Sequence, residues 1–76
     1  MTEEQTRRVE RDMRRSAKGE AVKVERIRTT LYAYGSELAC LRIFAHYLGG
    51  GILSREGLHV GYSENMGTWF FSVETT

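Results

Sequence analysis

The chain has no proline, a single cysteine and no long apolar run among its 76 residues. Because Cys40 has no second cysteine to pair with, an intrachain disulfide is excluded, which suits a reducing cytoplasm. No window approaches the roughly 18 consecutive apolar residues of a membrane span, and the acidic start MTEEQT leads into no apolar signal segment. The absence of proline leaves helices and strands uninterrupted. We therefore expect a protein of the cytoplasm.

The chain also has little net charge. Its 11 lysines and arginines are balanced by 10 acidic residues, which leaves a formal net charge of +1 at pH 7. Any basic surface must come from the arrangement of charges rather than from their excess. Hydrophobic residues make up 41% of the chain, enough for one core layer. We predict a single domain over residues 1–76, in which a basic amphipathic helix (1–19) precedes a β-α-β-β core (20–76).

The first helix is predicted from about residue 3 to residue 18. Thr2 and Gln5 have the spacing of a capping box, and Gly19 can end the helix. Apolar or small residues recur on one side and form a thin stripe: Thr6, Val9, Met13 and Ala17. So narrow a stripe predicts a weakly packed helix, which a partner could complete.

The other side of this helix is basic. A helical projection gathers six positive side chains there: Arg7, Arg8, Arg11, Arg14, Arg15 and Lys18. Several of them lie four residues apart, a spacing at which like charges repel, so a helix shaped only for solubility would avoid them. Three pairs of opposite charge at the same spacing instead favour a solvated helix face: Glu3–Arg7, Glu4–Arg8 and Glu10–Arg14. Three hypotheses stay open, a solvated face, a protein-docking face and a nucleic-acid face.

The segment from residue 20 to residue 35 alternates like a strand. Its apolar phase switches near Glu25 and Arg26, which predicts a bulge or an irregular strand start. Tyr32 and Tyr34 fall on the face opposite Leu31. Gly35 closes this strand.

A second helix is predicted from Ser36, its N-cap, to Gly49, its C-cap. The predicted core side consists of Leu38, Leu41, Phe44, Ala45 and Leu48, extended by Cys40, Ile43 and Tyr47, while Ala39, Arg42 and His46 form a narrow outward strip. Three glycines from position 49 to 51 then give a flexible exit.

The last third of the chain predicts a hairpin. Two alternating stretches flank the turn SENMG, in which Gly67 can take a left-handed conformation. If Trp69 and Phe71 face the second helix, then Phe70 lies on the other face of the sheet together with Tyr32 and Tyr34. The fold class is therefore α+β, a charged helix followed by strand-helix-strand-strand, with a small, largely antiparallel sheet on the central helix. The first helix, a ligand, a second copy or a partner could cover the aromatic face.

The residue types of catalytic and metal sites are present, but not in productive patterns. Cys40 lies among apolar helix positions, where a thiol is usually inert. Cys40, His46 and His59 match no zinc spacing. The glycine run follows a helix and precedes no G-K-[ST], so it is no phosphate loop. We expect no catalytic residue, no metal and no cofactor, and hence no enzyme.

Binding is the remaining class of function. Arginine guanidinium groups suit bidentate recognition of phosphate or carboxylate, and Tyr32 and Tyr34 could stack on bases. The stretch GTWFFSVET, however, lacks the basic, glycine-flanked pattern of an RNA recognition motif. The predicted partner-binding residues are Arg7, Arg8, Arg11, Arg14, Arg15, Lys18, Tyr32 and Tyr34. The alternative function is a small nucleic-acid-binding regulator that uses the arginines directly.

In size, in its lack of a catalytic pattern and in its surplus of charged and aromatic surface, the chain resembles the small anti-CRISPR proteins of phages and mobile elements. Those proteins share no common motif, so the resemblance carries over no functional residue. It implies a stoichiometric inhibitor that binds a host protein or ribonucleoprotein complex of bacterial immunity in the host cytoplasm. The expected partners include nucleic acid as a possibility but no membrane, and the chain is a monomer or a homodimer.

Overall fold

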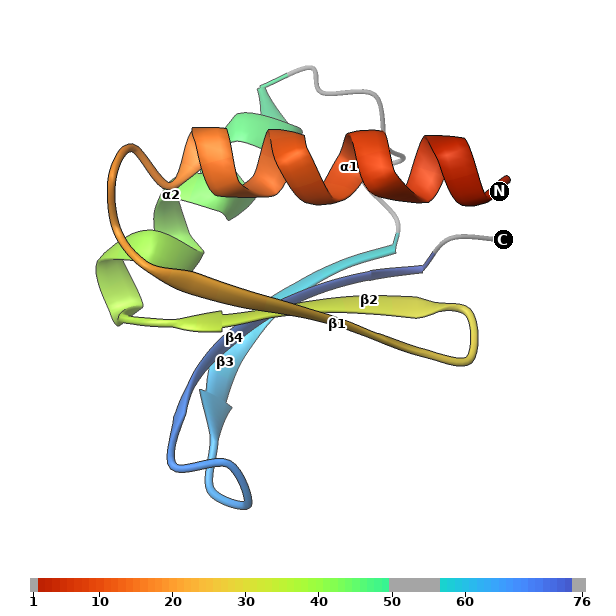
Figure 1. The fold of residues 1–76 in the computed structure, drawn as a ribbon. Helices are drawn as coiled ribbons and strands as arrows, with labels where there is room; N and C mark the ends of the chain where they lie inside the picture. The colour runs from red at the N-terminus through yellow and green to blue at the C-terminus, as the bar shows by residue number, and fades with distance from the viewer. Residues whose placement is uncertain (1, 50–56, 75–76) are drawn as a thin grey trace.

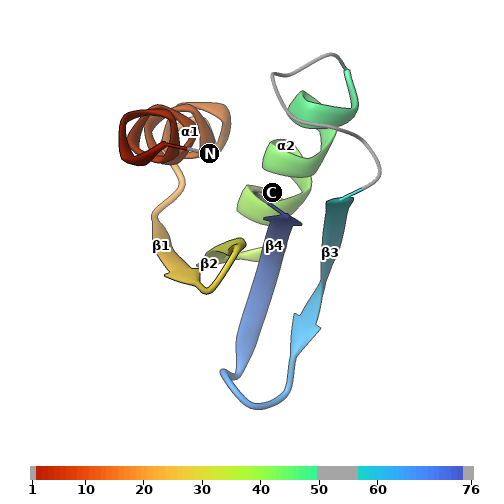
Figure 2. The same cartoon turned by 90° about the vertical axis from the view of Figure 1, so that its right-hand side faces the viewer.

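The computed structural model describes residues 2–49 and 57–74 and shows the α+β fold that the sequence predicts. Its elements follow in the order α1 (Glu3–Ser16), β1 (Val22–Ile27), β2 (Thr30–Gly35), α2 (Glu37–Leu48), β3 (Leu58–Ser63) and β4 (Thr68–Glu74) (Figure 1). The strands form one antiparallel sheet in the order β1-β2-β4-β3. Both helices lie on the same side of this sheet (Figure 2). Neither of these described helices is long and apolar enough to cross a membrane.

The residues that flank α1 set its ends. Thr2 Oγ1 accepts a hydrogen bond from the Gln5 backbone N–H at 3.1 Å, and Gln5 Oε1 accepts one from the Thr2 backbone N–H at 2.9 Å. This is the predicted capping box. The helix ends at Ser16, slightly earlier than predicted, because Lys18 and Gly19 take positive φ angles of 53° and 89°. Lys18 therefore lies in the turn after α1 rather than on the helix.

Residues 22–35 form a β-hairpin, and the prediction of a single strand with a bulge is wrong. The chain reverses at Arg28, whose φ is 55°, so that β1 and β2 pair antiparallel with Val24 opposite Ala33. Residues that lie opposite each other in an antiparallel pair share one face of the sheet. The switch of apolar phase near Arg26 is therefore the chain reversal itself. Tight hairpin turns usually carry glycine or asparagine at positive φ, and an arginine at that position concealed this one.

One cluster of buried side chains lies between the sheet and the helices. Its members come from both helices and from β2, β3 and β4: Val9, Met13, Ala17, Leu31, Ala33, Ala39, Cys40, Ile43, Tyr47, Leu58, Phe71 and Val73. The stripe of α1 is as narrow as predicted, yet Val9, Met13 and Ala17 are at most 1% exposed. Instead of packing weakly, α1 buries its whole apolar side in this core.

The sequence-based choice of the core side of α2 is right for Cys40, Ile43 and Tyr47, which are buried, but wrong for the leucines that were placed at its centre. Leu38, Leu41 and Leu48 are exposed, at 49%, 42% and 38% of their surfaces, and Ala45 is exposed as well. Ala39, assigned to the outward strip, is fully buried. The residues of α2 that enter the core are Ala39, Cys40, Ile43 and Tyr47.

Small side chains explain this orientation, because they let α2 approach the sheet closely. Cys40 Sγ lies 3.9 Å from the Ala33 carbonyl oxygen. A Cβ added to Gly35 would lie 3.5 Å from the Ala39 Cβ. Leucines in place of Ala39 and Cys40 would hold the helix away from the sheet.

The sheet face away from the helices carries the aromatic residues that were predicted for it. Tyr34 lies opposite Phe70 in the register of β2 and β4, and the adjacent Phe71 points into the core. Because α1 lies on the same side of the sheet as α2, the first helix does not cover this face (Figure 2). The predicted C-terminal hairpin is confirmed, with Gly67 at a φ of 66° in its turn.

Candidate partner-binding surfaces

The basic side of α1 is exposed as predicted. The six residues predicted for it are all exposed, although the last of them lies in the turn after the helix: Arg7, Arg8, Arg11, Arg14, Arg15 and Lys18. We call the five arginines among them the arginine face. Arg7 Nη2 lies 3.2 Å from Glu3 Oε1, the one predicted pair that forms. Within the described residues, the side chains of the other four arginines make no ion pair or hydrogen bond.

The two other predicted pairs, Glu4–Arg8 and Glu10–Arg14, are absent among the described contacts. Exposed pairs of long side chains are worth only about 0.2–1 kcal/mol, which does not hold them together against solvation and side-chain entropy. Apart from Arg7, the arginine face therefore presents guanidinium groups that are free to bind carboxylate or phosphate.

A contact between the helices fixes which arginines lie next to α2. His46 Nε2 of α2 lies 3.0 Å from Asp12 Oδ2 of α1. Arg8 and Arg15 are four residues before and three residues after Asp12, so they share its side of the helix. Arg7 and Arg14 project from the far side of α1. The arginine face is thus divided into a pair beside α2 and a pair remote from it.

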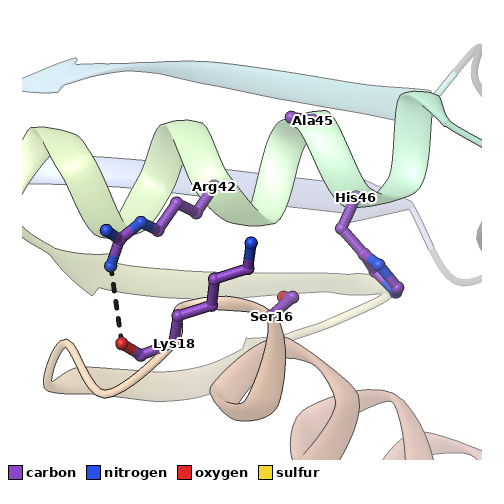
Figure 3. Close-up of a pocket in the computed structure, with 5 residues that line it drawn as sticks. All are labelled: Ser16, Lys18, Arg42, Ala45 and His46. Carbon is purple, nitrogen blue, oxygen red and sulfur yellow. Dashed lines mark hydrogen bonds between the residues drawn. The ribbon is translucent and has the colours of Figure 1, made fainter.

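A hollow of about 310 Å³ lies between the end of α1 and α2. It is lined by Ser16, Lys18, Arg42, Ala45 and His46 (Figure 3). Arg42 Nη1 donates hydrogen bonds to the carbonyl oxygens of Ala17 at 3.2 Å and Lys18 at 3.5 Å. These bonds satisfy carbonyl groups at the end of α1 and hold the guanidinium group in place. The Lys18 side chain extends toward α2, so two cationic groups face this hollow (Figure 3).

The exposed leucines of α2 form a second feature of the helix layer. We call Leu38, Leu41, Ala45 and Leu48 the leucine stripe, because their spacing places them on one side of the helix. This side points away from the sheet, since the buried residues of α2 lie opposite. Ala45 also lines the hollow that contains Lys18 and Arg42. The leucine stripe and the basic residues therefore meet on one continuous surface.

The aromatic residues of the sheet form a separate surface. The rings of Tyr32 and Tyr34 are nearly parallel, with an interplanar angle of 2° and centroids 5.8 Å apart, and Phe70 lies 6.3 Å from Tyr32. Gly61 lies beside the Phe70 ring, since a Cβ there would lie 3.5 Å from Phe70 Cε1, an ordinary van der Waals distance. Burial raises the pKa of the Tyr34 hydroxyl, and the nearby Glu25 carboxylate raises it further.

The structure does not bring all the predicted partner-binding residues together. The arginines and Lys18 lie on the helix side, whereas Tyr32 and Tyr34 lie on the opposite face of the sheet. The charges beside the tyrosines are mixed, because Lys23 pairs across strands with Tyr34 and Glu25 pairs with Tyr32. One strand of nucleic acid cannot contact the arginines and stack on these tyrosines without wrapping around the domain.

The Cys40 thiol and the Tyr47 hydroxyl lie in the core. Cys40 is fully buried, and this burial raises the pKa of its thiol, which keeps it protonated. Tyr47 Oη is buried without a hydrogen-bond partner among the described residues. Burial raises the pKa of Tyr47, and the neighbouring Asp12 carboxylate adds to that effect. Residues 2–49 and 57–74 contain no group of three potential metal ligands, and Gly50 and Gly51 of the glycine run lie outside the described residues.

Comparison with protein-family models, with curated proteins and with solved structures finds no match to this chain. The case for a function therefore depends on the surfaces themselves. Sequence analysis found the arginine face but missed the leucine stripe and the hollow. A signal for them was present, because only Glu37, Arg42 and His46 are polar in α2. When a helix is apolar on nearly all sides but packs against the core on only one, apolar side chains on its other sides stay exposed.

Proposed function

We propose that this protein is a non-catalytic binding protein that docks on another protein, or on a protein-containing complex, through the exposed surface of its helices. The observation that carries this proposal is the junction of the exposed leucine stripe with Lys18 and Arg42 around the hollow at Ala45, beside the arginine face of α1. Phosphate groups would satisfy the arginines but offer nothing to the leucines. A protein surface with an apolar centre and an acidic rim satisfies both, and arginine is enriched in such interfaces.

The narrower form of this proposal is an anti-CRISPR-type inhibitor in the cytoplasm of a bacterial host. Its support is the resemblance in size and in surplus charged and aromatic surface. An inhibitor of this kind blocks nucleic-acid recognition or cleavage by occupying a protein surface of the immunity complex. The test is target cleavage by purified bacterial CRISPR-Cas complexes, with and without a stoichiometric amount of this protein. Unchanged cleavage across the types of complex would contradict the inhibitor proposal while leaving the docking function in place.

The alternative, a nucleic-acid-binding regulator, is favoured by one observation, the four arginines of α1 without an ion pair among the described residues. Binding through them would weaken steeply with salt, because each neutralised phosphate releases counterions. A fluorescent DNA or RNA oligonucleotide titrated at low and at physiological salt tests this alternative. Salt-sensitive binding that needs Arg8 and Arg11 would support it over protein docking.

Affinity capture from a nuclease-treated bacterial lysate tests the docking proposal. The bait is the tagged protein, and the test variant is R8E/R11E. The matched control is R26E/R28E, which makes the same change of charge at exposed positions of the β1–β2 hairpin. We expect the wild type and the control to enrich the same protein or complex, and the test variant to lose it. Equal recovery by both variants, or recovery that occurs only when the nuclease is omitted, would overturn the proposal.

A further inference from the structure

We infer that the docking surface accepts an acidic amphipathic helix of the partner, which lies along α2 with its acidic edge toward α1. This inference rests on the proposed docking function and specifies the chemistry of the partner. It follows from the arrangement of apolar and basic groups around the hollow.

The apolar half of the argument is the leucine stripe. Its residues recur at the spacing i, i+3, i+7 and i+10, from Leu38 to Leu48, a length of about 15 Å at the rise of an α-helix. A partner helix that seats apolar residues of the same periodicity would cover the stripe along its whole length. Ala45 interrupts the leucines beside the hollow, so a large side chain of the partner can enter there. Binding of this kind removes the exposed leucines from water.

The charged half of the argument is the one-sided position of the basic residues. Arg8 and Arg15 lie on the side of α1 that faces α2, and Lys18 and Arg42 line the hollow between the helices. On the opposite side of the stripe, α2 begins with the acidic Glu37. A partner helix therefore needs carboxylates along the edge that faces α1. Asp12, an acidic residue of α1 on this side, lies 3.0 Å from His46 Nε2 of α2.

The same arrangement argues against other occupants. A second copy docked on the leucine stripe by a twofold axis that makes the two α2 helices antiparallel would bring two basic hollows to the same side, and like charges across an interface are unfavourable. A nucleic-acid strand would leave the leucines exposed. An anionic membrane is flat, whereas the site is a hollow between two helices. Each of these occupants is nevertheless a distinguishable outcome of the test below.

The test uses fluorescein-labelled peptides of about 20 residues, long enough to form helices alone. The probe carries leucines at i, i+3, i+7 and i+10 with glutamates along one edge. One control peptide has the same composition in scrambled order, and the other has lysines in place of the glutamates. By fluorescence anisotropy, we expect the probe to bind at least about ten-fold more tightly than either control.

Two matched variants locate the binding. R8E/R15E changes the arginines beside α2, and R7E/R14E makes the same change of charge at the same spacing on the far side of α1. We expect R8E/R15E and Leu41→Ser each to weaken probe binding by about ten-fold or more, and R7E/R14E by less than about three-fold. Equal effects of the two charge variants would show a general electrostatic attraction and overturn the inference. Failure of the probe to bind at about 100 μM would do the same.

Two further measurements identify the other occupants. Light scattering that shows a dimer which Leu41→Ser dissociates would assign the stripe to a second copy. Stronger, leucine-dependent binding to phosphatidylserine vesicles than to the peptide would assign it to a membrane.

The lysate capture separates this inference from the proposed function. If R8E/R11E loses the captured protein and Leu41→Ser retains it, the docking function stands and the helix inference falls. If neither variant loses it, the docking function itself falls.

Discussion

Ile43 and Leu41 lie on nearly opposite sides of α2, and truncating each to alanine tests which side belongs to the core. Ile43 is fully buried, whereas Leu41 is 42% exposed. A buried isoleucine cut to alanine costs about 2–5 kcal/mol, because the lost transfer energy adds to a cavity. A chain of 76 residues has a total free energy of unfolding of only about 4–11 kcal/mol. Ile43→Ala should therefore remove a large fraction of the stability and lower Tm by at least about 8 °C.

Leu41→Ala should have a much smaller effect. The leucine side chain is only partly removed from water, and alanine has the higher helix propensity, so we expect a loss below about 1 kcal/mol. Urea titration followed by the fluorescence of Trp69, the only tryptophan, gives both free energies. If Leu41→Ala costs as much as Ile43→Ala, then the leucine stripe is part of the core. The orientation of α2, and with it the docking surface, would then be wrong.

Three other predictions concern the core and its polar groups. Met13→Ala should lower the free energy of unfolding by about 2–5 kcal/mol because Met13 is fully buried. Arg14→Ala, on the exposed side of the same helix, should change it by less than about 0.5 kcal/mol. Equal effects of the two variants in urea titrations would show that α1 does not pack in the core. Tyr47→Phe removes a buried hydroxyl whose neighbouring acceptor, the Asp12 carboxylate, lies outside regular hydrogen-bond geometry, so the free energy of unfolding should change by less than about 1 kcal/mol; a larger destabilisation would show that Tyr47 and Asp12 are hydrogen-bonded. The Cys40 thiol, buried and with a raised pKa, should react with a disulfide reagent such as DTNB only as fast as the protein opens. Rapid labelling of the native protein would contradict its burial.

Local signals allowed several elements to be predicted from the sequence. The capping box of Thr2 and Gln5 fixed the start of α1, and Gly67 marked the turn between β3 and β4. Both depend on residue types that favour one local geometry. The hairpin turn at Arg28 was missed because its residue has no such preference, although the backbone adopts a φ of 55° there.

The orientation of α2 could not be predicted by periodicity alone. Both sides of this helix are apolar, and the choice between them depended on how closely the helix could approach the sheet at Gly35 and Ala33. That is a property of tertiary packing. The separation of the arginine face from Tyr32 and Tyr34 has a similar cause, because the side of the sheet on which α1 lies is not encoded in the pattern of α1.

Acetylation of the two lysines in a partner complex tests the central claim most directly. Both are exposed, and they lie on opposite sides of the molecule, with Lys18 lining the hollow and Lys23 on the aromatic face of the sheet. Mass spectrometry gives the acetylation rate of each lysine, both in the complex and in the free protein. Docking through the helices predicts that Lys18 becomes protected by about ten-fold or more, while Lys23 reacts as before. Protection of Lys23 with Lys18 unchanged would place the partner on the sheet and contradict the account.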